Sequence, residues 1–177
     1  MTALDRASMT LHVDINFRLA KHDDIPKLEW DGQYTHFRNL FRRAYREQKH
    51  GRRLILLADY NNYPIGHIFI QLYSQNSRIA DGTDRAYFYS FRVMAPFRGQ
   101  GVGTRIINES QTLMLDRGFS AITIAVAKEN INALRLYERL GYQKFAEDAG
   151  HWSYTDHRGR TRHVEEPCWL LEKILIT

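Results

Sequence analysis

The part of this sequence with the most chemical content is a glycine-rich segment, Arg98-Gly99-Gln100-Gly101-Val102-Gly103-Thr104. It lies between a predicted strand and the beginning of a predicted helix. Glycines at such a junction let the backbone turn sharply and leave successive N–H groups uncovered, and the helix dipole adds positive potential there. The segment therefore predicts a site for a phosphate or pyrophosphate, with Arg98 as a fixed positive charge.

Two common phosphate-binding motifs do not account for this segment. A Walker loop ends in Gly-Lys-Ser/Thr, whereas Gly103 is followed directly by Thr104. A dinucleotide fingerprint lies in the first βα turn and carries a third glycine, but this segment is in the middle of the chain and has Ile106 at that position. The remaining alternative is a glycine-rich turn that binds no ligand.

A second segment follows after one predicted helix and one predicted strand, and it reads Asn130-Ile131-Asn132-Ala133-Leu134-Arg135-Leu136-Tyr137-Glu138-Arg139-Leu140-Gly141-Tyr142. Together the two segments resemble the GCN5-related N-acetyltransferase superfamily. The positions that match the family pattern are Arg98, Gly101, Gly103, Asn130, Ala133, Leu136, Tyr137, Gly141 and Tyr142. The order of the predicted elements also resembles the family fold, so the likeness covers nearly the whole chain.

The resemblance implies that acetyl-coenzyme A is the cofactor. In such enzymes two strands splay apart, and the pantetheine arm lies in the gap along the backbone of the fourth strand, while the pyrophosphate lies on the glycine-rich segment. The side-chain amide of Asn130 would bond the pantetheine arm, unless that residue is only a helix cap. The cofactor-binding residues implied are Phe91, Arg92, Val93, Arg98, Gly99, Gln100, Gly101, Val102, Gly103, Thr104, Asn130 and Ala133.

The resemblance also implies that Tyr137 is catalytic, with its hydroxyl directed at the sulfur. When an amine attacks a thioester the leaving thiolate needs a proton, and a phenol can donate one. A backbone N–H near Val93 is a candidate for holding the developing oxyanion. The alternative is a core tyrosine, because Leu134, Leu136 and Leu140 lie on the same helix.

The general base stays open, because neither the fourth strand nor the fifth carries a carboxylate. The candidates are Glu29, Asp31, His151 and a water molecule that relays the proton to solvent. The lack of a glutamate in the fifth strand also argues against a ribosomal-protein N-terminal acetyltransferase.

The acceptor site in this family lies between the first two helices, the fourth strand and the loop before the last strand. The residues predicted there are Trp30, Tyr34, Tyr87, Tyr89, His151, Trp152 and Tyr154. Aromatic faces hold an amine by cation–π attraction or an aryl group by stacking, although each of these residues is equally a candidate for the core. We expect the acceptor to be the amine of a small molecule or peptide.

The elements that must position these residues alternate along the chain, which predicts an α/β or α+β fold. Predicted strands cover residues 13–20, 53–59, 65–73, 86–94, 120–127, 142–146 and 167–176, with a long polar loop before the last one. Predicted helices cover a short stretch after Asp23 and Asp24, then residues 34–48, 102–117 and 131–140. The family resemblance implies a mixed, mostly antiparallel sheet of about seven strands, with the fourth and fifth strands splayed.

Length and composition indicate one globular domain over residues 1–177, with residues 1–12 as a flexible N-terminal extension. Of the 177 residues 44% are hydrophobic and 25% are charged, which is ordinary globular usage. A single cysteine, Cys168, excludes an intramolecular disulfide and a multi-cysteine zinc site, so we expect a cytoplasmic protein. The longest apolar run, Leu54 to Ala58, is far short of a membrane span, and the histidine spacing predicts no metal site.

The net charge of +5 is concentrated in residues 36–53, which contain seven basic residues and one acidic residue, Glu47, and therefore carry a net charge of +6. The remaining residues together carry −1. Such a run is usually a solvated helix face, and the alternative is that it attracts an anionic substrate or the cofactor phosphates. No nucleic-acid partner is expected for the domain as a whole. The competing functions are a non-catalytic acyl-coenzyme A sensor and a nucleic-acid-binding module that uses this helix. Enzymes of this fold often self-associate, so a homodimer is a further expectation.

Overall fold

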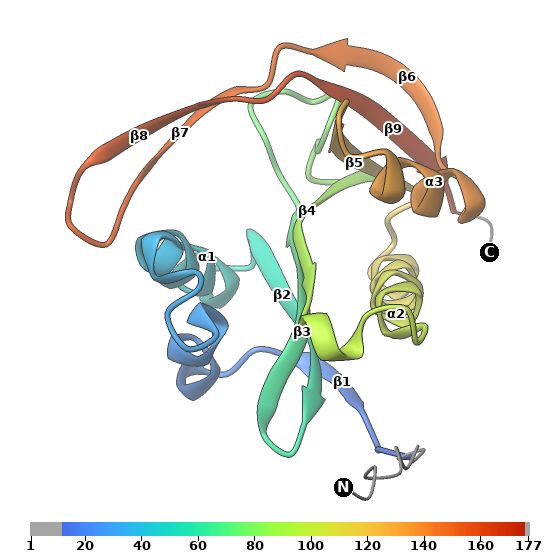
Figure 1. Ribbon diagram of the computed structural model, residues 1–177. Helices are drawn as coiled ribbons and strands as arrows, with labels where there is room; N and C mark the ends of the chain where they lie inside the picture. Colours follow the sequence, from blue (N-terminus) through green and yellow to red (C-terminus); the bar gives the residue numbers. More distant parts are fainter. Residues whose placement is uncertain (1–11, 176–177) are drawn as a thin grey trace, which may run out of the picture.

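The computed structural model describes residues 12–175, which form a seven-stranded sheet with helices on both faces (Figure 1). The strands, in their order across the sheet, are β1 (Asn16–Leu19), β2 (Arg53–Tyr60), β3 (Tyr63–Gln71), β4 (Arg85–Val93), β5 (Ala121–Ala127), β9 (Cys168–Ile174) and β6 (Gln143–Asp148). All neighbours are antiparallel except β4 and β5, which are parallel. The predicted mixed, mostly antiparallel sheet is confirmed.

Three α-helices cover the sheet, one on one face and two on the other (Figure 1). On the first face α1 (Arg38–Lys49) packs Phe41 and Ala44 against buried residues of β2 and β3. On the second face lie α2 (Val102–Asp116) and α3 (Ile131–Arg139), whose apolar side chains join the larger core cluster. Because both faces of β3 are covered, its alternating pattern separates two buried sides, with Ile68 in one cluster and Phe69 in the other.

The short helix predicted after Asp23 and Asp24 is present as 3₁₀ turns instead of an α-helix, and the side chains of Asp23 and Asp24 do not cap the turn that begins at Pro26. The turns are η1 (His22–Asp24), η2 (Pro26–Glu29) and η3 (Thr35–Phe37), and a fourth, η4 (Ala95–Phe97), follows β4. The carboxylate of Asp24 is buried and accepts hydrogen bonds from the Arg18 guanidinium, at 2.6 and 2.9 Å, and from the Lys21 N–H at 2.7 Å. Arg18 also pairs with Asp59 of β2. Through Arg18, the Asp24 carboxylate therefore links the turn to β1 and β2 instead of capping a longer helix.

The long polar loop predicted before the last strand is also wrong, because this segment forms a second sheet. Strands β7 (His151–Thr155) and β8 (Thr161–Glu165) make a two-stranded hairpin, here called the arm, that reaches across to α1 (Figure 1). At its turn the buried carboxylate of Asp156 accepts hydrogen bonds from the N–H groups of Arg158 and Arg160 and from Arg162 Nε. The Asn39 side chain donates to the Asp156 carbonyl oxygen at 2.7 Å, which fixes the arm to α1.

The remaining predicted elements lie close to the observed ones. None of the helices found in residues 12–175 is long and apolar enough to span a membrane. Of the predicted N-terminal extension, residues 1–11 lie outside the part of the chain that the structure describes.

Candidate active site

The gap between β4 and β5 is the central feature of the site. The two strands pair from Arg85 opposite Ala121 to Phe88 opposite Ile124, and beyond this point β4 and β5 no longer pair with each other. The rest of β4 stays paired with β3, while β5 continues along β9. Backbone groups at the open edge of β4 are therefore available to a ligand, because buried N–H and C=O groups otherwise need partners.

A β-bulge in β4 determines which of its side chains lie on the α1 face of the sheet. Phe69 pairs with Tyr89 but His67 pairs with Arg92, so β4 contains one more residue than β3 over this stretch. At the bulge Ser90 has a left-handed φ of +50°. An extra residue reverses the alternation of side chains, which places Arg92 on the α1 face together with Tyr89.

The glycine-rich segment forms a compact turn at the beginning of α2. Gly99 and Gly101 have φ values of +71° and +84°, which favour glycine. A Cβ on Gly103 would lie 3.0 Å from Phe91 Cζ, so the first turn of α2 lies directly against β4. Uncovered N–H groups at a helix N-terminus, with no side chains over them, fit a pyrophosphate. The Arg98 side chain donates from Nε to the Val93 carbonyl oxygen at 2.7 Å and so ties this turn to the end of β4.

Of the other residues predicted for the cofactor, Gln100 donates to the Pro96 carbonyl oxygen at 2.8 Å, while Val102 is buried and Thr104 is half-buried in the first turn of α2. The side chain of Asn130 caps α3 by accepting from the Ala133 N–H at 3.1 Å. That bond uses its carbonyl oxygen and leaves the NH₂ group for a ligand.

The predicted proton donor, Tyr137, lies on α3 and is 5% exposed. Its ring lies beside Phe91, with 6.4 Å between centroids, and packs edge-on against Tyr142 at 5.7 Å. Burial raises the pKa of the Tyr137 phenol, so the hydroxyl keeps its proton at neutral pH. Burial likewise raises the pKa of the Tyr87 phenol.

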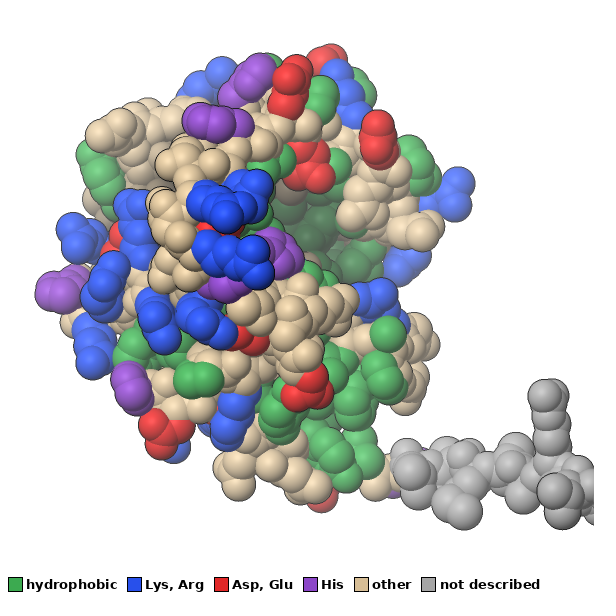
Figure 2. Space-filling model, turned by 60° about the vertical axis from the view of Figure 1, so that its left-hand side comes forward, with side chains coloured by type: hydrophobic (Ala, Val, Ile, Leu, Met, Phe, Trp, Pro, Cys, Tyr) green, Lys and Arg blue, Asp and Glu red, His purple; other side chains and the backbone are tan. Residues whose placement is uncertain are grey.

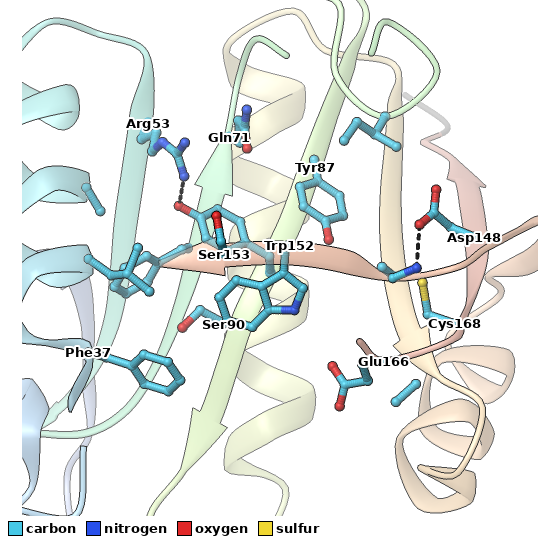
Figure 3. Close-up of a pocket in the computed structure, with 18 of the residues that line it drawn as sticks. Phe37, Arg53, Gln71, Tyr87, Ser90, Asp148, Trp152, Ser153, Glu166 and Cys168 are labelled. Atoms are coloured by element: carbon cyan, nitrogen blue, oxygen red, sulfur yellow. Dashed lines mark hydrogen bonds between the residues drawn. The ribbon is translucent and has the colours of Figure 1, made fainter. Parts of the chain in front are cut away.

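A cavity of about 610 Å³ lies on the α1 face, between α1, the splayed ends of β4 and β5, and the arm (Figure 3). Figure 2 shows the hollow from outside, lined by hydrophobic side chains. Of the residues predicted for the acceptor, Tyr87, Tyr89, His151 and Trp152 line this cavity. The rings of Tyr87 and Tyr89 are stacked, with centroids 5.6 Å apart, and form one wall.

The other three residues predicted for the acceptor do not line the cavity. Trp30 is in the core, where its indole N–H donates to the Pro64 carbonyl oxygen at 2.8 Å. Tyr154 joins the arm to η3, just before α1, through its ring contact with Phe37, at 5.0 Å between centroids. Tyr34 contacts a lining residue, Arg92, whose guanidinium is 4.5 Å from the centre of the Tyr34 ring.

Charged groups of opposite sign occupy different sides of the cavity. Arg53, at the left in Figure 3, contacts the Tyr89 hydroxyl and pairs with Glu47, which also pairs with Arg43. Asp148 and Glu166 lie at the other side, where the arm leaves the sheet. The sequence predicts a loop around these two carboxylates and therefore does not indicate them as site residues. The turn residues Asp156 to Gly159 are the signal that points to a hairpin in this segment.

The candidate bases are now distinguished by position. Glu29 does not line the cavity, and the ion pair with Arg38, at 2.6 Å, lowers the pKa of its carboxyl. Asp31 does not line the cavity either, whereas His151 does. Asp148 and Glu166 extend the set of candidates. Cys168 also faces the cavity, but burial raises the pKa of its thiol, which disfavours a thiolate nucleophile.

Most of the basic segment, residues 36–53, lies on α1, where exposed Lys and Arg side chains gather on the face shown in Figure 2, while Arg53 begins β2 and is half-buried. Three of its seven cations, Arg38, Arg43 and Arg53, form ion pairs with carboxylates. Within residues 12–175, no three or more His, Cys, Asp or Glu side chains are grouped in a way that could hold a metal ion.

Comparison with known proteins connects this geometry to a family. The chain is 38% identical over 68 residues to thialysine N-epsilon-acetyltransferase of Mus musculus, and 38% identical over 64 residues to the Bos taurus protein of the same name. The matched stretch covers 38% of this chain and 40% of the mouse protein, so the chain matches only about two fifths of the length of that relative.

Solved structures share the fold at low identity. The ribosomal-protein-S18-alanine N-acetyltransferase from Escherichia coli has a TM-score of 0.68 and 15% identity over 93% of this chain and 96% of that one. Naa50 from Arabidopsis thaliana, in complex with the bisubstrate analogue CoA-Ac-MVNAL, has a TM-score of 0.67 and 19% identity over 92% of this chain and all of that one. Residues 20–142 match the acetyltransferase (GNAT) family, and this chain belongs to that family.

Proposed function

We propose that this chain is an acetyl-coenzyme A-dependent N-acetyltransferase that acts on the amine of a small molecule. The observation that carries the proposal is the gap that opens after Phe88 and Ile124, with the glycine turn of α2 on one side of it and the cavity on the other. A solved structure of the same fold holds a coenzyme A bisubstrate analogue. The mouse relative is named for an acetylated small amine, thialysine, which supports a small-molecule acceptor.

When bound, acetyl-coenzyme A supplies an acetyl group activated as a thioester. The first-turn N–H groups of α2 would hold its pyrophosphate, and the open edge of β4 would hold its pantetheine arm. The Tyr137 ring lies beside Phe91, which follows the last β4–β5 pair, and burial raises the pKa of its phenol, so it keeps its proton at neutral pH. Tyr137 is therefore the group proposed to protonate the leaving thiolate.

The cavity supplies the groups that act on the amine. Asp148 and Glu166 place negative charge at the rim, which attracts an ammonium group. A carboxylate or the His151 imidazole at this position can accept the proton that the amine must lose before it attacks. The stacked rings of Tyr87 and Tyr89 give the acceptor an aromatic wall.

Two measurements test the proposal. Calorimetry should show acetyl-coenzyme A binding, and thiol release should rise when small amines are added to the loaded protein. Binding without turnover on any amine would indicate an acyl-coenzyme A sensor instead. No binding of acetyl-coenzyme A would refute the proposal, and steeply salt-dependent binding of DNA or RNA would then favour a nucleic-acid module that uses α1.

A further inference from the structure

Arg92 is a positive charge on the wall of the cavity with no negative partner among residues 12–175. It lines the cavity together with two other arginines, Arg43 and Arg53, and both of those pair with Glu47. Arg92 forms no ion pair with any described carboxylate. A guanidinium stays protonated in proteins, so this charge persists at every physiological pH.

The groups around Arg92 are neutral and hold it in one orientation. Its guanidinium lies over the rings of Tyr34 and Phe37, at 4.5 and 5.0 Å from their centres. Its Nη1 donates to Ser90 Oγ at 2.7 Å and lies 3.4 Å from His67 Nε2. Burial and the charge of Arg92 keep the pKa of His67 well below its usual value, so this histidine is neutral. These contacts use only part of the five N–H donors of an arginine.

A desolvated charge without a counterion is costly, whereas hydrogen bonds from arginine to a carboxylate are among the strongest in proteins. Burial disfavours the charged form of Arg92 and lowers its pKa. An anionic group in the cavity would complete the site. Because the β4 bulge turns Arg92 to the α1 face, away from the glycine turn of α2, that anion belongs to the acceptor and not to the cofactor phosphates.

We propose that Arg92 binds a carboxylate of the acceptor, so that the substrate is an amino acid or a closely related amine that carries a carboxylate. This proposal rests on the proposed acetyltransferase function. It agrees with the distribution of charge in the cavity. In Figure 3 the two contacts of Arg92 that are labelled, Ser90 and Phe37, lie at the left of the view, and Asp148 and Glu166 lie at the right. A substrate with a carboxylate at one end and an ammonium group at the other matches both sides.

Pairs of amines that differ only by a carboxylate provide the test: lysine with cadaverine, and ornithine with putrescine. For at least one pair, kcat/KM of the unchanged protein should favour the carboxylate-bearing member by about 10- to 100-fold, the size expected for hydrogen bonds to a charged group. Arg92→Gln should abolish the preference by raising KM for that member, and the readout is the ratio of kcat/KM within each pair, which a general loss of activity or of cofactor affinity would leave unchanged. Arg92→Lys keeps the charge but not the planar fork, and should retain part of the preference.

The control is Arg46→Gln, which removes an exposed cation of α1 that does not line the cavity and should leave the preference intact. A preference retained by Arg92→Gln, or absent from every pair, would overturn the assignment of Arg92 even if amines are acetylated. If no amine is acetylated, the proposed function fails. Calorimetric titration of the coenzyme A-saturated protein with the same pairs then decides on Arg92 alone, since equal affinity for both members of every pair contradicts the proposal.

Discussion

A Cβ on Gly150 would lie 1.8 Å from the carbonyl oxygen of Glu166, because the chain enters the arm at Gly150 and leaves it at Glu166, and the two segments are in close contact there. Gly150 has a φ of +69°, and its carbonyl oxygen accepts from the Glu166 N–H at 3.1 Å. Any side chain must therefore push the arm strands apart. We expect Gly150→Ala to shift the arm, raise KM for the amine by about tenfold or more, and leave acetyl-coenzyme A binding nearly unchanged.

Gly159 provides a matched control for this substitution. It lies in the turn of the arm with a φ of +77°, and a Cβ there would meet nothing within 4 Å. Gly159→Ala should cost about 1–2 kcal/mol from the left-handed conformation alone, and Gly150→Ala about 1–3 kcal/mol more from the clash. Urea denaturation measures both losses of stability. Equal KM values for the amine in the two variants would contradict the predicted role of the contact between Gly150 and Glu166.

Removal of the Tyr137 hydroxyl should slow the reaction without loosening the cofactor. The phenol is buried at the gap beside Phe91, and burial raises its pKa, so it is a proton donor throughout the neutral range. We expect Tyr137→Phe to lower kcat by roughly 10- to 1000-fold, the range for a lost general acid, with Kd for acetyl-coenzyme A within about twofold.

Tyr142 serves as the control because it packs edge-on against Tyr137 but bonds elsewhere. Its hydroxyl accepts from Gln111 Nε2 at 3.0 Å. Tyr142→Phe should cost about 1 kcal/mol of stability for one buried hydrogen bond and leave kcat nearly unchanged. Equal kcat values for Tyr137→Phe and the unchanged protein would remove Tyr137 from the mechanism.

The sheet could be predicted from the sequence because its strands carry local signals. Runs such as 53–59 and 120–127 are rich in strand formers, and the two motif segments fix the order of the elements. The arm has a weaker signal: Trp152 and Tyr154 alternate with polar residues in β7, but β8 contains a single apolar residue, Val164, and both strands are largely exposed. Their position depends on tertiary contacts, such as the hydrogen bond from Asn39 to Asp156, which are 117 residues apart in the chain.

The part of the candidate site that belongs to local motifs could be predicted from the sequence, and the part assembled by tertiary contacts could not. Residues of the glycine turn and Tyr137 belong to local motifs, whereas the acceptor cavity is assembled from α1, β4 and the arm. The bulge at Ser90 is the clearest example of what the sequence alone does not show. One extra residue decides that Arg92 faces α1, and simple alternation from Tyr89 would have placed it on the opposite face.

The turn of the arm should lose stability in acid through Asp156. Hydrogen bonds from the Arg160 and Arg158 N–H groups and from the Arg162 guanidinium lower the pKa of its carboxyl from 3.8 to about 2. A carboxyl with a lowered pKa in the folded state stabilises the fold at pH values above its normal pKa, and that contribution is lost as the pH falls through the folded value. The stability difference between the unchanged protein and Asp156→Asn should therefore be full above about pH 5 and shrink between about pH 4 and pH 2.

Two readouts check this expectation. The Asp156 carboxyl should titrate near pH 2 by NMR, and the Arg158 and Arg160 amides should exchange faster with solvent in Asp156→Asn at pH 5. Asp23→Asn is the control for loss of a surface carboxylate, because that side chain is 94% exposed. A titration of Asp156 at its ordinary value would show that these hydrogen bonds do not favour the carboxylate.

The glycine turn before α2 should determine affinity for acetyl-coenzyme A through its backbone conformation. Gly101 immediately precedes α2 with a φ of +84°, and Gly118, just beyond the other end of the helix, has a φ of +86°. A Cβ on either would meet nothing within 4 Å, so alanine imposes the same strain at both positions, about 1–2 kcal/mol.

Only at Gly101 does relief of that strain redirect the N–H groups proposed to hold the pyrophosphate. Gly101→Ala should therefore raise Kd for acetyl-coenzyme A by about tenfold or more, while Gly118→Ala should lower stability by a similar amount and leave Kd unchanged. Calorimetry measures both, and equal Kd values would place the pyrophosphate away from this turn.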